Sequence, residues 1–284
     1  MYIRLRLLIV LNFLLLIISG RSLIAQRDEL NSEGENYLAD IQSFYERILK
    51  SDSTNYDALT NLGVIFQSTE GGGDLKKSLS YFEKAVKLHP KKSRTYHNLG
   101  ILYSLMNQLD NAVINLNKAA QLDTTSPNSI RQLGIIYLQN DMFSNAIEAF
   151  SRALNRDKFD VESRLGKSLA FWSLEEYDSV LAEINEMQSL GLRFNRMELL
   201  LADVYFKKND YDKAMKYAKL DKSENSSQAE GHYLLGVLYK MKDEKDKAEF
   251  EFEEAFTIAS QNLNSSLTFS INLFFESNIK KQLE

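Results

Sequence analysis

The 284-residue sequence contains no cysteine, only two prolines and only twelve glycines. Without cysteine the chain can form no disulfide and carry no lipid anchor on an N-terminal cysteine, so an exported form must draw its stability from packing. Few prolines and glycines, together with 44% hydrophobic residues, favour a helix-rich chain over a strand-rich one. We therefore predict an all-α fold.

The first 25 residues differ in kind from the rest. The start "MYIRLR" carries two arginines, an apolar run spans Leu7–Ile18, and small residues lead to Ala25. This order is typical of a secretory signal peptide, and twelve apolar residues are few for a bilayer span. We predict cleavage after Ala25 and an exported protein of the periplasm or cell envelope, with no membrane span after cleavage. Leu23 is large where a small residue is preferred, so an uncleaved membrane anchor is the alternative.

Acidic residues outnumber basic ones after residue 25. Removing residues 1–25 takes away three arginines and no acid, which changes the net charge from −5 to −8. Nucleic acids and anionic membrane surfaces both reward clustered positive charge. The charge balance therefore argues against both as partners.

A 34-residue period runs through the chain. The segments Tyr96–Asp123 and Ile130–Asp157 match in residue type at that offset, and five units of 34 fill residues 93–262 without insertion or deletion. Four columns of similar residues continue at this spacing: Gly100, Gly134, Ser168, Ala202 and Gly236; Tyr103, Tyr137, Phe171, Tyr205 and Tyr239; Ala112, Ala146, Val180, Ala214 and Ala248; and Leu116, Phe150, Ile184, Ala218 and Phe252. Such a period indicates a repeat architecture.

Each column has a physical reason. Within a unit, apolar residues fall at helical spacing in two stretches separated by a polar turn, which predicts a pair of antiparallel helices. Small residues where the helices cross let the backbones approach closely, and the aromatic residue fills the space beside that contact. Because one hairpin cannot bury its own apolar face, neighbouring hairpins must stack to form the core.

This pattern resembles the tetratricopeptide repeat family. The matching residues are Leu99-Gly100, Tyr103 and Ala112, with counterparts such as Leu133-Gly134 and Leu235-Gly236. The resemblance implies an all-α, right-handed superhelical solenoid of about six helix hairpins with capping helices. It also implies a concave groove, lined by the first helices, that binds a partner's extended peptide or helix.

Two units depart from the family pattern. In the fourth unit Lys167-Ser168 replaces the Leu-Gly pair, and a glycine comes early at Gly166. The fifth unit has Asp221 at a weakly matching place. We interpret both as repeats with looser packing.

An earlier unit begins near Tyr56, and its second half arrives three residues late. The segment "TEGGGDLKKS" (Thr69–Ser78) looks like a phosphate-binding loop, but its spacing does not match the Walker pattern and no strand precedes it. We interpret Gly71–Gly73 as an insertion in the turn between the two helices, with Lys76 and Lys77 facing solvent.

The predicted organisation covers the whole chain. The C-terminal segment fits a helix through Leu267 and Ile271 or a strand by alternation, and we favour a helix because a helical array offers a lone strand no partner. The segments are a signal peptide (1–25), a polar linker (26–34), an N-terminal capping helix (35–55), six repeats (56–92, 93–126, 127–160, 161–194, 195–228 and 229–262) and a C-terminal capping segment (263–284).

No pattern indicates an enzyme, a cofactor or a metal site. The three histidines, His89, His97 and His232, lie in different units, so they cannot share a metal ion. The repeats use nearly all of the chain after residue 25, and no catalytic domain is left to assign. Function must therefore come from the surface.

By the resemblance, the groove-facing slots change in character along the chain. They hold Asn61, Arg94, His97, Asn98, Asn128, Arg131 and Gln132 in the first units, and Leu165, Leu169, Trp172, Leu200 and Tyr233 in the later ones. The amides of Asn61, Asn98 and Gln132 share one slot and could hydrogen-bond a peptide backbone; alternatively, polar residues simply fill a wet surface. Some of the apolar residues must be core contacts, and Trp172 is the candidate for an exposed anchor.

The function predicted from these features is a non-enzymatic protein-interaction scaffold of the cell envelope. A periplasmic chaperone or assembly factor that holds exported clients is the first alternative, and a regulatory ligand-binding subunit of an envelope enzyme is the second. One subset of the family grips chaperone C-termini, but of the matching slots here only Asn98 fits. The sequence names neither the partner nor the oligomeric state.

Overall fold

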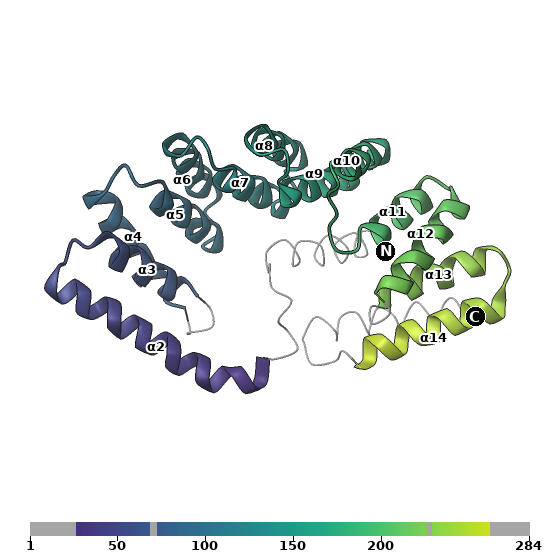
Figure 1. Ribbon diagram of the computed structural model, residues 1–284, viewed down its shortest axis with the longest axis horizontal. Helices are drawn as coiled ribbons and strands as arrows, with labels where there is room; N and C mark the ends of the chain where they lie inside the picture. Colours follow the sequence, from purple (N-terminus) through teal and green to yellow (C-terminus); the bar gives the residue numbers. More distant parts are fainter. Residues whose placement is uncertain (1–26, 69–72, 226–228, 262–284) are drawn as a thin grey trace. The chain divides into compact units, whose positions relative to one another are not determined.

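A computed structural model describes residues 27–68, 73–225 and 229–261, and within these ranges every regular element is an α-helix (Figure 1). The predicted all-α class is confirmed. The predicted signal peptide, the C-terminal segment 263–284 and residues 69–72, which include Gly71 and Gly72 of the predicted insertion, lie outside the described residues. The helices are α2 (Arg27–Ser51), α3 (Tyr56–Gln67), α4 (Leu75–Leu88), α5 (Ser93–Leu105), α6 (Leu109–Leu122), α7 (Asn128–Gln139), α8 (Phe143–Arg156), α9 (Val161–Ser173), α10 (Tyr177–Ser189), α11 (Met197–Lys207), α12 (Tyr211–Glu224), α13 (Ala229–Met241) and α14 (Lys245–Gln261).

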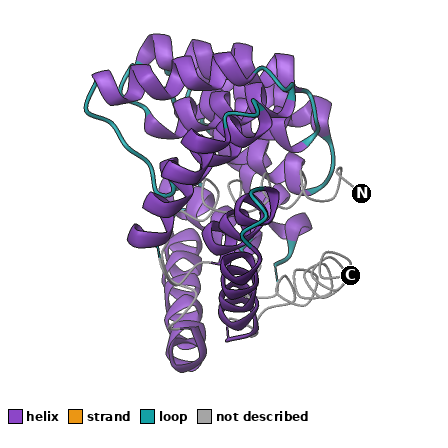
Figure 2. Cartoon of the chain, turned by 90° about the vertical axis from the view of Figure 1, so that its right-hand side faces the viewer, coloured by secondary structure: helices purple, strands orange, loops and turns teal. Residues whose placement is uncertain are grey.

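The chain divides into two compact units. Unit 1 is Met1–Leu174 and unit 2 is Glu175–Glu284, so the boundary falls between α9 and α10, inside the fourth predicted repeat. Unit 1 contains α2, the hairpins α3/α4, α5/α6 and α7/α8, and α9. Unit 2 contains α10 and the hairpins α11/α12 and α13/α14. Figure 2 shows the helices joined by loops.

Glycine sets the approach of the two helices within a hairpin. A Cβ added to Gly134 on α7 would lie 2.7 Å from the ring of Phe150 on α8, which is too close for any real contact. Gly63, Gly100 and Gly236 meet Phe82, Leu116 and Phe252 in the same way. At these four positions the predicted crossing column is therefore occupied by glycine because the facing large side chain takes the space a Cβ would need.

The second helices bury their predicted columns. The small column and the large column of α6, α8, α10, α12 and α14 are at most 4% exposed: Ala112, Ala146, Val180, Ala214, Ala248, Leu116, Phe150, Ile184, Ala218 and Phe252. Tyr103 and Tyr137 pack partly buried against one core cluster, and Tyr205 and Tyr239 against another. Within each unit the core thus runs between the helices of a hairpin and on into the next hairpin.

The turn within each hairpin from the second onwards repeats one backbone device. A non-glycine residue adopts φ between 57° and 64° at Asn107, Asp141, Glu175, Asn209 and Asp243, which are 34 residues apart. At the first of these turns the N–H of Gln108 donates to the carbonyl of Tyr103 at 2.8 Å, and at the second Met142 donates to Tyr137 at 2.9 Å. This is the hydrogen bond that closes many helix C-termini, and Asn and Asp tolerate the left-handed conformation better than most residues.

The turn of the first hairpin opens α4 with an ordinary helix cap. The carboxylate of Asp74 accepts a hydrogen bond from the N–H of Lys77 at 3.0 Å. Lys76 and Lys77 are exposed, as the sequence predicted. The described part of this turn serves to start a helix.

One boundary differs from the prediction. Residues 27–34 were expected to form a polar linker, but α2 begins at Arg27 and runs unbroken to Ser51. No proline lies in this segment, and a single glycine inside a helix costs only about 1 kcal/mol. Polar composition alone therefore did not indicate a linker here.

The early glycine of the fourth unit also has a structural reason. The ring of Phe150 lies between Gly134 on α7 and Gly166 on α9, and a Cβ on either glycine would overlap it. A single phenyl ring thus separates the first helices of two successive hairpins, and α7 and α9 contact each other. The departure at Gly166 marks tighter packing, and the looser packing we predicted for this unit is wrong at this point.

Candidate functional site

The polar residues predicted to line a groove lie on α3, α5 and α7 in unit 1. Neighbouring first helices are in contact, α3 with α5 and α5 with α7. We call the surface that carries these residues the first-helix face, and its members are Asn61, Arg94, His97, Asn98, Asn128, Arg131 and Gln132. Hydrogen bonds between successive first helices hold part of this face in place.

The two arginines of this face are compensated by neighbours. Arg94 donates to Asn61 Oδ1 at 2.6 Å and lies 4.0 Å from the carboxylate of Asp57. Arg131 makes ion pairs of 2.8 Å with both Asp160 and Glu162. Since Arg131 is only 23% exposed and faces two carboxylates, it adds no net positive charge to the face.

His97 is neutral in this setting. Its Nδ1 lies 3.1 Å from Ser129 Oγ on the next first helix. Burial lowers the pKa of His97 below its usual 6.5, and the nearby charge of Arg131 lowers it further. At pH 7 the ring is therefore an uncharged hydrogen-bonding group.

Asn98 stands out among these residues. Its Nδ2 is buried, and in the described part of the chain it is the one buried side-chain nitrogen or oxygen without a hydrogen-bond partner. Asn61, which was expected to share its slot, accepts from Arg94. The amides predicted to act alike therefore differ: Asn61 is hydrogen-bonded within the protein, whereas Asn98 has a donor without a partner.

The apolar residues predicted for the groove are mostly core residues, which corrects the sequence interpretation. Leu165, Leu169, Trp172 and Leu200 are at most 6% exposed. Trp172, at 2%, is therefore not an exposed anchor. Tyr233 is partly buried beside Ala229, Ala255 and Ile258, with its ring 5.8 Å from that of Phe252. Periodicity could not separate these core positions from surface ones, because both recur at helical spacing.

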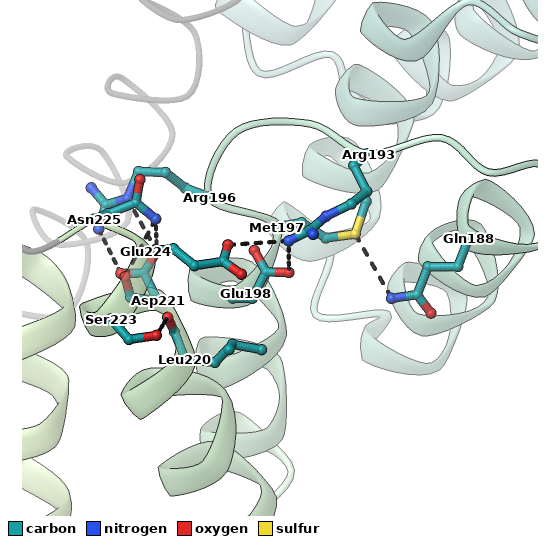
Figure 3. Close-up of polar contacts among 10 residues, drawn as sticks. All are labelled: Gln188, Arg193, Arg196, Met197, Glu198, Leu220, Asp221, Ser223, Glu224 and Asn225. Atoms are coloured by element: carbon teal, nitrogen blue, oxygen red, sulfur yellow. Dashed lines mark hydrogen bonds and ion pairs between the residues drawn. The ribbon is translucent and has the colours of Figure 1, made fainter.

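The sequence analysis missed a buried ionic network in unit 2 (Figure 3). Arg196 directly precedes α11 with φ 67°, and its guanidinium lies 3.0 Å from Asp221 Oδ2. The same guanidinium lies 2.8 Å from Glu230 Oε2. Arg193 pairs beside it with Glu198 and Glu224. Arg196 therefore links the start of α11 to α12 and α13.

The charge of Arg196 is stable in this site. Burial works against the charged form, but Glu230 and Asp221 more than offset it and raise the pKa of Arg196 above its usual value. A Cβ on Gly231 would lie 2.7 Å from Asp221 Oδ2, so that glycine makes room for the carboxylate. The signal in the sequence was Asp221 itself, since an acid in a core column requires a buried partner.

The described residues offer neither a metal cluster nor a membrane span. Among them, no group of three or more His, Cys, Asp or Glu side chains could hold a metal ion. Within the same ranges no helix has both the length and the apolar character needed to cross a membrane.

Comparisons with known proteins agree with the repeat pattern. Family models described as tetratricopeptide repeat match residues 81–114, 199–220 and 229–262. No curated protein matches the chain.

Solved structures share the fold at low sequence identity. A tetratricopeptide repeat protein from Parabacteroides merdae is 21% identical over 87% of this chain and 95% of its own, with a TM-score of 0.59. PilF from Pseudomonas aeruginosa is 16% identical over 78% of this chain and 97% of its own, with a TM-score of 0.58. PilW, a type IV pilus biogenesis factor, is 14% identical over 76% and 97%, with a TM-score of 0.57. Three segments of the chain therefore match tetratricopeptide repeat models, and the fold is that of tetratricopeptide repeat proteins.

Proposed function

We propose that this chain is a non-enzymatic scaffold of the cell envelope that binds a protein partner along the first-helix face of unit 1. The observation that carries the proposal is the unused donor of Asn98. Leaving a buried amide N–H without an acceptor costs about 1–3 kcal/mol. The Asn98 side chain as a whole is partly exposed, so rotation of its amide group would present this donor to a backbone carbonyl of an extended peptide.

The ion pairs on the first-helix face favour recognition of a partner by hydrogen bonds and not by net charge. Arg131 is already paired with Asp160 and Glu162, and Arg94 is held by Asn61 near Asp57. An acidic ligand segment would have to compete with these carboxylates. We therefore expect binding to depend only weakly on salt concentration, because the arginine charges are already compensated.

Replacing Asn98 with leucine tests this function. The partner would first be recovered by crosslinking in cells and identified by mass spectrometry, and its affinity would then be measured by calorimetry. We expect Asn98→Leu to weaken binding on the order of tenfold, because a hydrogen bond to the ligand is lost. Thermal stability should stay the same or rise, because the variant removes an unsatisfied buried donor.

Asn145→Leu is the matched control, since Asn145 is exposed on the second helix α8. This variant should bind the partner like the parent. Unchanged affinity in Asn98→Leu would rule out the first-helix face. Suppressed aggregation of unrelated unfolded proteins, without one defined partner, would instead favour the chaperone function.

The envelope location rests on the N-terminal sequence and has its own test. Protein recovered from an envelope fraction should begin at or near Gln26, because the residues before it fit a cleavable signal peptide. N-terminal sequencing or intact mass would measure this. Recovery of an intact Met1 in the membrane fraction would instead identify an uncleaved anchor.

A further inference from the structure

Helix α2 exposes a position that every later hairpin buries. By the 34-residue period Phe44 falls in the small column, and it is 50% exposed. The other members of that column are at most 4% exposed: Ser78, Ala112, Ala146, Val180, Ala214 and Ala248. Within the described residues no first helix precedes α2. The repeat geometry therefore places a helix at Phe44 that this part of the chain does not supply.

The surface around Phe44 suits another helix. Ile41 and Ile48 lie one turn to either side of it and are partly exposed, so the three form an apolar stripe. Asp40 and Arg47 flank the stripe; both are exposed, and neither has an ion-pair partner among the described residues. We call this surface the α2 stripe.

We propose that a second copy of this chain occupies the α2 stripe, with the two α2 helices antiparallel about a twofold axis at Phe44. In that arrangement Asp40 of each copy lies near Arg47 of the other, so the same ion pair forms twice. A parallel arrangement would bring like charges together. Charge complementarity thus selects the antiparallel pair and a copy of the same chain.

The size of Phe44 fits this arrangement. In the hairpins α3/α4, α5/α6, α7/α8 and α13/α14 a small residue accompanies a close crossing at a glycine. Two α2 helices have no glycine at this crossing, and ordinary helix pairs pack about 8–10 Å apart. An aromatic side chain fills the wider gap, and a central aromatic residue is a frequent hot spot of interfaces.

The test uses charge reversal in the full chain as recovered from expressing cells, with mass measured by sedimentation equilibrium. The parent should dimerise in a concentration-dependent way, because one helix pair buries less area than a standard interface. Asp40→Arg and Arg47→Asp should each raise the dimer dissociation constant on the order of tenfold or more, because each places like charges opposite each other. Helical content should not change.

Mixing the two variants makes the test decisive. One variant then presents two arginines and the other two aspartates, so an equimolar mixture should recover dimers, and so should the double variant. Phe44→Ala should weaken the dimer, whereas Ile114→Ala, at an apolar residue 64% exposed on α6, should not. A parent that stays monomeric, a dimer that survives Asp40→Arg, or a mixture that stays monomeric would each overturn the proposal.

Discussion

Replacing Asp221 with alanine should destabilise unit 2 by about 3–5 kcal/mol, because it leaves Arg196 buried with a partner removed. The result is informative because alanine is the usual residue at the repeat position that Asp221 occupies. This position recurs every 34 residues and is fully buried each time, at Ala85, Ala119, Ala153, Met187, Asp221 and Ala255. A substitution toward the repeat pattern should therefore be harmful. Hydrogen exchange should localise the loss of protection to α11, α12 and α13.

Asp212→Ala is the matched control, since Asp212 lies on the same helix and its pair with Lys242 is on the surface. It should cost at most about 1 kcal/mol. The double variant Arg196→Met/Asp221→Ala should recover most of the lost stability, because an apolar pair often replaces a buried ion pair without loss. A double variant no more stable than Asp221→Ala would mean that the network does more than compensate one charge.

Gly166→Leu should destabilise unit 1 by about 1–3 kcal/mol or more, because the new side chain overlaps the ring of Phe150. Phe150→Ala alone should cost about 3–5 kcal/mol through the cavity that it leaves. The double variant should cost clearly less than the sum of the two, since leucine can occupy part of the vacated space. Urea unfolding of the three variants measures this.

Ser144→Leu controls for the added leucine, because Ser144 is exposed on α8. Its effect should stay within about 0.5 kcal/mol. Strict additivity of Gly166→Leu and Phe150→Ala would contradict the contact between these two positions.

The repeat pattern could be predicted from the sequence because the residues that form it contact each other within one hairpin. Gly134 and Phe150 sit in one hairpin, so their spacing is constant and their roles follow from helical periodicity. The polar face was also found, because Asn61 and Asn98 recur at matching slots. What each amide contacts was not readable, because Arg94 reaches Asn61 from another helix.

The missed features depend on contacts between separate elements. Trp172 occupies a slot that could face outward or inward, and only packing decides that it is buried. Arg196 meets Asp221 across 25 residues and through a left-handed backbone that no sequence pattern specifies. Gly166 and Asp221 both break the repeat pattern, and both mark contacts between separate helices. Departures from the repeat pattern were therefore the best available sign of such contacts in the sequence.

The locality of the contacts has a consequence for how the chain folds. Side-chain hydrogen bonds between hairpins span short stretches of sequence: His89 to Thr54 covers 35 residues, Arg156 to Ala120 covers 36 and Thr95 to Tyr56 covers 39. Chains whose contacts are close in sequence lose little loop-closure entropy and fold quickly. Each hairpin can thus assemble during synthesis, as soon as the next 34 residues become available. Unfolding should likewise proceed one hairpin at a time from an end. A pulling experiment should therefore record a series of small steps and no single large rupture.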